Sequence, residues 1–174
     1  MAALHSAVIL FALSGLFGKW LALPAFYIVA GRACFATFAI FLLLSYTRQL
    51  RLDYSLKQYG LFMATGMLLA VHWTSFFYAI QVSTITIGLI TFACFPLMVS
   101  VIEPWLLKER FRWQTVAQAG LVLAGIALIM PKTAASTGYQ LGLITGLLSA
   151  LTFAVLTILN RKLVGHHSAY VIAG

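Results

Sequence analysis

Two polar side chains lie deep inside long apolar segments, where they could bind a solute. Arg32 falls about eight residues, or roughly 12 Å, inside an apolar segment at 25–46. A charge at that depth in a bilayer costs at least about 2.5 kcal/mol, so the guanidinium is expected to face a polar cavity and to attract an anionic or zwitterionic solute. The alternative is an arginine that reaches the headgroups or pairs with backbone carbonyls.

The second of these side chains is His72, which lies about nine residues from the end of the next apolar segment, 58–80. This segment runs in the opposite direction, so His72 and Arg32 are expected at nearly the same depth and could share a cavity. Thr65, His72 and Ser75 recur at helical spacing and define one face. A hydrogen-bonded packing role is the alternative for His72.

Together these residues define a predicted substrate-binding cavity. Its candidates are Arg32, His72, Trp73, Ser75 and Thr91. His72 is also a candidate proton carrier, because an unperturbed imidazole titrates near neutral pH. The sequence contains no phosphate-binding glycine loop, metal-ligand cluster or nucleophile motif. We therefore expect no catalytic residue, no metal, no cofactor and no enzymatic activity.

Composition places these residues in a membrane. The chain is 63% hydrophobic and 8% charged, too few polar residues for the surface of a soluble domain. Apolar segments of about 20 residues are long enough to cross the hydrocarbon as helices. They lie at 4–22, 25–46, 58–80, 84–107, 112–130 and 140–163, and another begins near Ser168. The predicted fold is an all-α membrane protein, a polytopic helical bundle of six complete transmembrane helices plus the start of a seventh.

The basic residues indicate orientation. A net charge of +8 would suggest nucleic acid in a soluble protein, but here the charges cluster at the ends of apolar segments. One side of the predicted membrane collects Arg48, Arg51, Lys57, Lys108, Arg110, Arg112, Arg161 and Lys162, against Lys19 and Lys132 on the other. The positive-inside rule then makes that side, and the amino terminus, cytoplasmic. We expect a multi-pass protein of the inner (plasma) membrane, with the bilayer and a small solute as partners and no nucleic acid.

The fourth segment carries features that could move. Pro96 sits in mid-segment and removes one backbone hydrogen bond, so a bend or break is expected there, with a hinge role. Glu103, Glu109 and Arg110 lie at or near the inner interface. One interpretation pairs the carboxylates with basic residues of the same loop. The alternative is a gating contact.

A repeat divides the chain. Residues 27–31, Tyr-Ile-Val-Ala-Gly, return as Tyr-Val-Ile-Ala-Gly at 170–174, an offset of 143 positions (170 − 27). One repeat then holds five spans, and an odd number inverts the next copy, giving a 5+5 inverted-repeat transporter. The predicted domains are 4–132, with five transmembrane helices, and 139–174, with the sixth and the beginning of the seventh. On this interpretation the sequence is truncated, and the native protein would have about 280 residues.

Several motifs, taken in order, resemble the EamA-type domain of the drug/metabolite transporter superfamily. They are Arg32, Tyr78-Ala79-Ile80 before a turn at Ser83-Thr84, Phe95-Pro96-Leu97, Leu107-Lys108-Glu109-Arg110, and then Gln114, Gly120, Gly125 and Pro131. The resemblance covers about residues 5–131 as a first domain and 139–174 as the start of a second. It implies an inner-membrane permease of ten helices, with a substrate cavity between two inverted halves and alternating access.

The residues and the resemblance together favour a permease or exporter of small metabolites such as amino acids or related solutes, with a proton gradient as candidate energy source. One alternative is a non-transporting scaffold assembled through small-residue faces such as that of Gly142, Gly146 and Ala150, whose spacing predicts close helix packing. Another is an intramembrane lipid-modifying enzyme with His72 as base. If the native chain is this short, a homodimer would supply the missing half.

Overall fold

The computed structural model describes residues 5, 20, 21, 23–48, 54–108, 113–129 and 137–164. Every element in these ranges is a helix. They are α2 (Ala25–Tyr46), α3 (Leu56–Val82), α4 (Ile85–Phe92), α5 (Phe95–Leu107), α6 (Trp113–Ile129) and α7 (Thr137–Val164). They match the predicted second to sixth spans, while the first predicted span and the start of the seventh fall largely outside the described residues.

Among the described residues, four helical segments are long and apolar enough to cross a bilayer. They are Ala25–Tyr46, Leu56–Val82, Ile85–Leu107 and Thr137–Arg161. The α6 helix has 17 residues, slightly fewer than the roughly 20 that a full span needs. The prediction of an all-helical membrane protein is therefore confirmed, whereas the count of six complete transmembrane helices is not.

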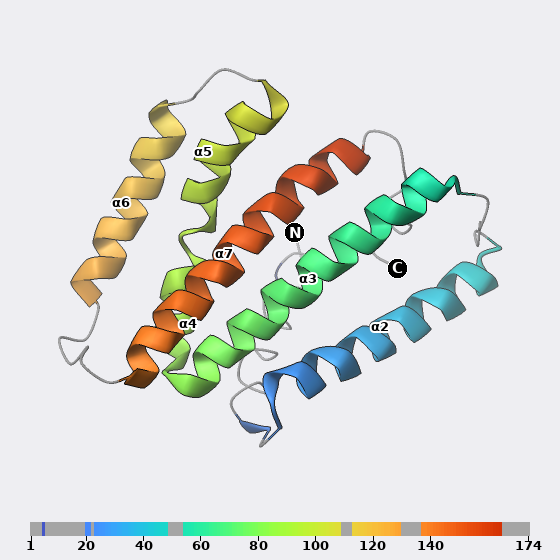
Figure 1. Cartoon of the computed structure of the whole chain (residues 1–174), viewed down its shortest axis with the longest axis horizontal. Coiled ribbons are helices and arrows are strands. Elements are labelled where there is room, and N and C mark those ends of the chain that lie inside the picture. Colours follow the sequence, from blue (N-terminus) through green and yellow to red (C-terminus); the bar gives the residue numbers. More distant parts are fainter. Residues whose placement is uncertain are drawn as a thin grey trace.

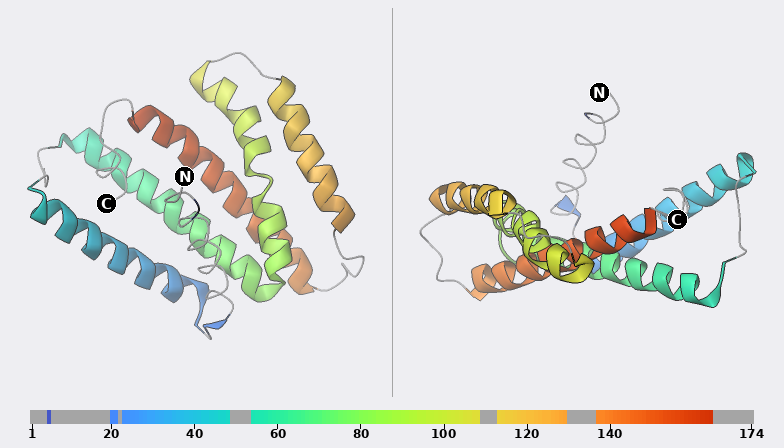
Figure 2. Two further views of the ribbon diagram at one scale, coloured as in Figure 1. Left: turned by 180° about the vertical axis from the view of Figure 1, so that it is seen from behind. Right: turned by 90° about the horizontal axis from the view of Figure 1, so that it is seen from above.

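The helices lie side by side in the order α6, α5, α7, α3, α2, with α4 leading into α5 (Figure 1). Seen from above, they form a curved layer (Figure 2). The α7 helix, the last of the described elements, lies at the centre, because it packs against α3 on one side and against α4 and α5 on the other.

Local sequence sets where these helices begin. Ser55 starts α3 with a capping box: its hydroxyl accepts from the backbone N–H of Gln58, and the Gln58 side chain accepts from the Ser55 N–H. Thr84 caps α4 by accepting from the backbone N–H of Ile87 at 3.2 Å. Both caps satisfy N–H groups that a helix start leaves without partners. Only Ser83 and Thr84 separate α3 from α4, so the two helices are joined by a tight turn.

Glycines on α7 allow it to approach its neighbours closely. A Cβ atom built on Gly146 would lie 1.9 Å from Oγ1 of Thr91 on α4, and one on Gly142 would lie 2.3 Å from Oγ of Ser83. Ala150 is fully buried on the same face. The close packing predicted for this face is confirmed, and the contacts it makes are with helices of the same chain.

The fourth predicted span is broken in the middle. The α4 helix ends at Phe92, α5 begins at Phe95, and Ala93 and Cys94 form a turn between them, here called the break. Pro96 occupies the first turn of α5. Proline has no N–H and is tolerated there, but in a continuous helix it would remove the bond to the carbonyl four residues earlier. The predicted break is confirmed, while its action as a hinge is a proposal.

Candidate functional site

The Arg32 guanidinium stacks on an aromatic surface within the membrane-spanning helices. Its central carbon lies 4.5 Å from the ring centroid of Trp73 and 5.4 Å from that of Phe77. The two rings are themselves stacked, with centroids 5.7 Å apart and planes inclined by 22°. A cation over a tryptophan face is stabilised by the ring quadrupole, and more so when water is excluded. Arg32 is half-buried and Phe77 is fully buried.

Helix packing explains why Arg32 reaches Trp73. Ala25 and Ile28 of α2 pack against Phe76, Phe77 and Ile80 of α3 to form the buried core. Arg32 follows Ile28 by one helical turn, and Trp73 precedes Phe77 by one turn on the helix that runs the other way. The next pair along the interface is therefore Arg32 with Trp73. The predicted equal depth of Arg32 and the residues around position 72 agrees with this contact.

His72 faces α7 and is 2% exposed. Its Nδ1 atom lies 2.9 Å from the hydroxyl and 3.0 Å from the carbonyl oxygen of Ser149, which is itself fully buried. When Nδ1 carries no proton, the hydroxyl can donate to it; when it is protonated, it can donate to the carbonyl. Either tautomer thus has a partner, so His72 is a buried, hydrogen-bonded link between α3 and α7.

Aromatic rings surround the imidazole. The ring centroids of Phe153, Trp73, Phe92 and Phe76 lie 4.6, 5.0, 5.2 and 6.3 Å from that of His72. Trp73 contacts both His72 and Arg32, so a single side chain lies between the imidazole and the guanidinium. The structure therefore assembles three of the predicted cavity candidates, Arg32, Trp73 and His72, in one contact series.

The hydroxyls of the other two candidates bond to their own helices. Ser75 donates to the carbonyl of Val71 at 2.7 Å, and Thr91 donates to that of Ile87 at 2.7 Å. Both residues are buried, and Thr91 packs directly against Gly146. Each hydroxyl thus donates to a carbonyl of its own helix, as is usual for buried Ser and Thr side chains that pack between helices. A role in binding solute stays a prediction for both.

Near the end of α5, Glu103 forms an ion pair with Arg161 of α7. This partner lies 58 positions away on another helix, a pairing that the sequence did not indicate. The pairing is possible because α5 and α7 lie side by side and end at the same edge of the assembly (Figure 1). The interpretation that pairs Glu103 with basic residues of its own loop, and the alternative of a gating contact, both stay predictions. Glu109 and Arg110 lie outside the described residues.

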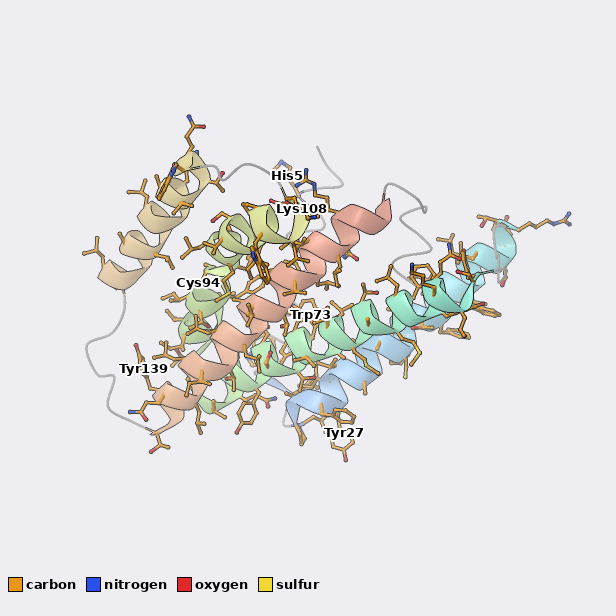
Figure 3. The ribbon with its side chains drawn as sticks, turned by 45° about the horizontal axis from the view of Figure 1, so that its top comes forward. His5, Tyr27, Trp73, Cys94, Lys108 and Tyr139 are labelled. Carbon is orange, nitrogen blue, oxygen red and sulfur yellow. The ribbon has the colours of Figure 1, made fainter. Side chains whose placement is uncertain are left out.

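Basic positions collect at that same edge. The ends of α2, α5 and α7 and the start of α3 lie there, and these termini carry Arg48, Lys108, Arg161 and Lys57. Figure 3 shows Trp73 about midway along α3, Lys108 just beyond the end of α5 and Tyr139 in the first turn of α7. These four are among the eight basic residues that the sequence predicts on one side of the membrane, whereas Lys19 and Lys132, predicted on the other side, lie outside the described residues.

Sequence reasoning missed three residues of α7 that complete these contacts: Ser149, Phe153 and Arg161. The small-residue ladder gave a signal for the first, because Ser149 directly precedes the buried Ala150 and had to lie near the packed face. Phe153 follows Ser149 by one turn and so reaches the same histidine. No local pattern marked Arg161 as the partner of Glu103.

Within the described ranges, no group of three His, Cys, Asp or Glu side chains could hold a metal ion. The sequence profile of the EamA-like transporter family matches residues 1–130. No curated protein and no solved structure matches the chain.

Proposed function

The chain belongs to the EamA-like transporter family, membrane transporters of the drug/metabolite superfamily, and from this premise we propose that it moves small metabolites such as amino acids or related solutes by alternating access. The transport class follows from the family match, which covers 130 of 174 residues. The substrate class and the mechanism are our proposal.

One observation carries the choice of substrate: the guanidinium of Arg32 stacked on Trp73 within a membrane-spanning helix pair. A positive charge in this low-dielectric setting attracts a carboxylate far more strongly than it would in water. The planar guanidinium also matches the two oxygens of a carboxylate. Arg32 would bind the carboxylate of the solute, and Trp73 would hold Arg32 in place and contact the apolar part of the solute.

Comparing the exchange of amino acids with negative, neutral and positive side chains tests this proposal. We expect vesicles containing the protein to exchange labelled glutamate or leucine in a saturable way, and to exchange lysine at least about tenfold more slowly, because a second positive charge near Arg32 costs more than about 1.4 kcal/mol. Vesicles without protein supply the background. Equal exchange of all three, or exchange of lysine alone, would contradict the assignment of Arg32 as the substrate-attracting charge.

Alternating access needs elements that move, and we propose the break and the Glu103–Arg161 pair for this role. Pro96 would make the break a hinge, and the ion pair would join α5 to α7 when the cytoplasmic edge is closed. Separate charge reversals, Glu103→Arg and Arg161→Glu, should each lower exchange several-fold, and the double reversal should restore part of it. Failure of the double variant to exceed both single ones would exclude a gating pair.

We also propose a domain organisation, an orientation in the membrane and a test of proton coupling. Two inverted domains, 4–132 and 139–174, would be oriented with the amino terminus and the basic edge in the cytoplasm of an inner-membrane protein, and topology reporters fused at either edge would check this. Coupling to protons through His72 is supported only by the residue type, since its Nδ1 is engaged by Ser149. Measuring exchange with and without a pH gradient tests whether transport is coupled to protons.

A further inference from the structure

Phe153 of α7 contacts both sides of the break. Its ring centroid lies 5.2 Å from that of Phe92, the last residue of α4, and 5.1 Å from that of Phe95, the first residue of α5. Both contacts are edge-to-face, at 65° and 85°, a favourable geometry for aromatic pairs. Phe92 and Phe95, on either side of the turn formed by Ala93 and Cys94, are stacked on each other at 5.1 Å, so the three rings contact one another where the two helices meet.

The same ring also contacts the histidine next to the solute-binding candidates. Phe153 lies 4.6 Å from His72, the shortest of the four ring contacts that His72 makes. Ser149, one turn earlier on α7, holds the Nδ1 atom of this imidazole. Two successive turns of α7 therefore fix His72, and His72 in turn packs on Trp73, the ring under Arg32.

From this arrangement we infer that Phe153 is a positioning residue that couples the Arg32–Trp73 site to the geometry of the break. The contact series runs from Arg32 through Trp73 and His72 to Phe153, and from Phe153 to Phe92 and Phe95. A solute that shifts Trp73 must repack His72 and Phe153, because close-packed rings cannot move independently. The inference rests on the proposed function for the identity of the site, whereas the contacts at the break do not depend on it.

Cys94, one of the two residues of the break, is a native reporter. It is half-buried, and the second cysteine, Cys34, is exposed on α2 and can be replaced. In the Cys34→Ser protein, labelling of Cys94 by N-ethylmaleimide measures how often the break opens. Phe153→Leu removes both edge-to-face contacts and should raise the labelling rate about fivefold without any solute, whereas Phe153→Tyr, which keeps the ring, should not. Phe35→Leu, at an exposed phenylalanine of α2, is the matched control.

Solute then tests the coupling. In the parent protein, saturating leucine or glutamate should change the Cys94 labelling rate at least about threefold, and Phe153→Leu should abolish this response and lower kcat while leaving KM within about twofold. If Phe153→Leu yields no folded protein, Phe153→Met keeps the volume without the ring.

The outcomes separate the two proposals. An unchanged basal labelling rate in Phe153→Leu, or a solute response that survives in it, overturns the role of Phe153 even when exchange is normal. An altered basal rate in a protein that neither binds nor exchanges any amino acid overturns the proposed function and the coupling, and leaves only the packing at the break.

Discussion

Replacing Arg32 by alanine is expected to lower kcat/KM for amino acid exchange about 100-fold, the largest functional effect of any single substitution in the described helices. The loss combines a charge-assisted bond to the solute carboxylate with the electrostatic attraction of a half-buried cation. The measurement is initial exchange rate against solute concentration in vesicles.

Two further variants make this result specific. Arg32→Lys keeps a positive charge but lacks the planar group that stacks on Trp73, so we expect an intermediate loss of about tenfold. Arg48→Ala removes an exposed arginine just beyond the end of α2 and should stay within about twofold of the parent. An Arg32→Ala protein that folds and exchanges as fast as the parent would show that the arginine only packs against Trp73.

Replacing Gly146 by alanine is expected to produce the largest loss of stability. The added methyl group would lie 1.9 Å from Oγ1 and 2.7 Å from Cβ of Thr91, and neither atom is the end of a flexible chain. Thr91 is also held by its bond to the Ile87 carbonyl and by a stiff β-branched side chain. Separating α7 from α4 to relieve this contact should cost about 3 kcal/mol and lower the apparent Tm by about 10 °C in thermal unfolding followed by circular dichroism.

Gly66→Ala is the matched control for this prediction. Gly66 lies in the interior of α3, where a Cβ atom would meet nothing within 4 Å, so alanine should be neutral or stabilise the helix by up to about 1 kcal/mol. If both variants unfold at the parent temperature, the close contact between α4 and α7 is not a feature of the folded protein. Equal destabilisation would point instead to a general intolerance of alanine.

The helices could be predicted from the sequence because the properties that form or break a helix belong to neighbouring residues. The span from 25 to 46 was predicted at the bounds observed, because long apolar runs must form helices in a bilayer. The break in the fourth span followed from Pro96, since a missing N–H acts on its own helix and needs no partner to be foreseen. Counting residues along two oppositely directed helices predicted Arg32 and His72 at one depth, and the contact of Arg32 with Trp73, the neighbour of His72, agrees with this.

Contacts between distant segments could not be read in the same way. The partners of His72 and Glu103 both lie on α7, which the sequence indicated as the start of a second repeat without showing that it would occupy the centre of the layer. Helical periodicity gives the face of a helix but does not name the helix that covers it. Consequently the partners that Ser149, Phe153 and Arg161 contact emerged only from the arrangement in space.

The central claim is that a solute binds at the Arg32–Trp73 pair, and tryptophan fluorescence of the purified protein tests it most directly. The chain has four tryptophans, of which Trp20, Trp105 and Trp113 are exposed and Trp73 is half-buried beneath Arg32. We predict that leucine or glutamate changes the emission in a saturable way and that the change disappears in both Trp73→Phe and Arg32→Ala. A saturable change that persists in both variants would place the binding site elsewhere and contradict this account.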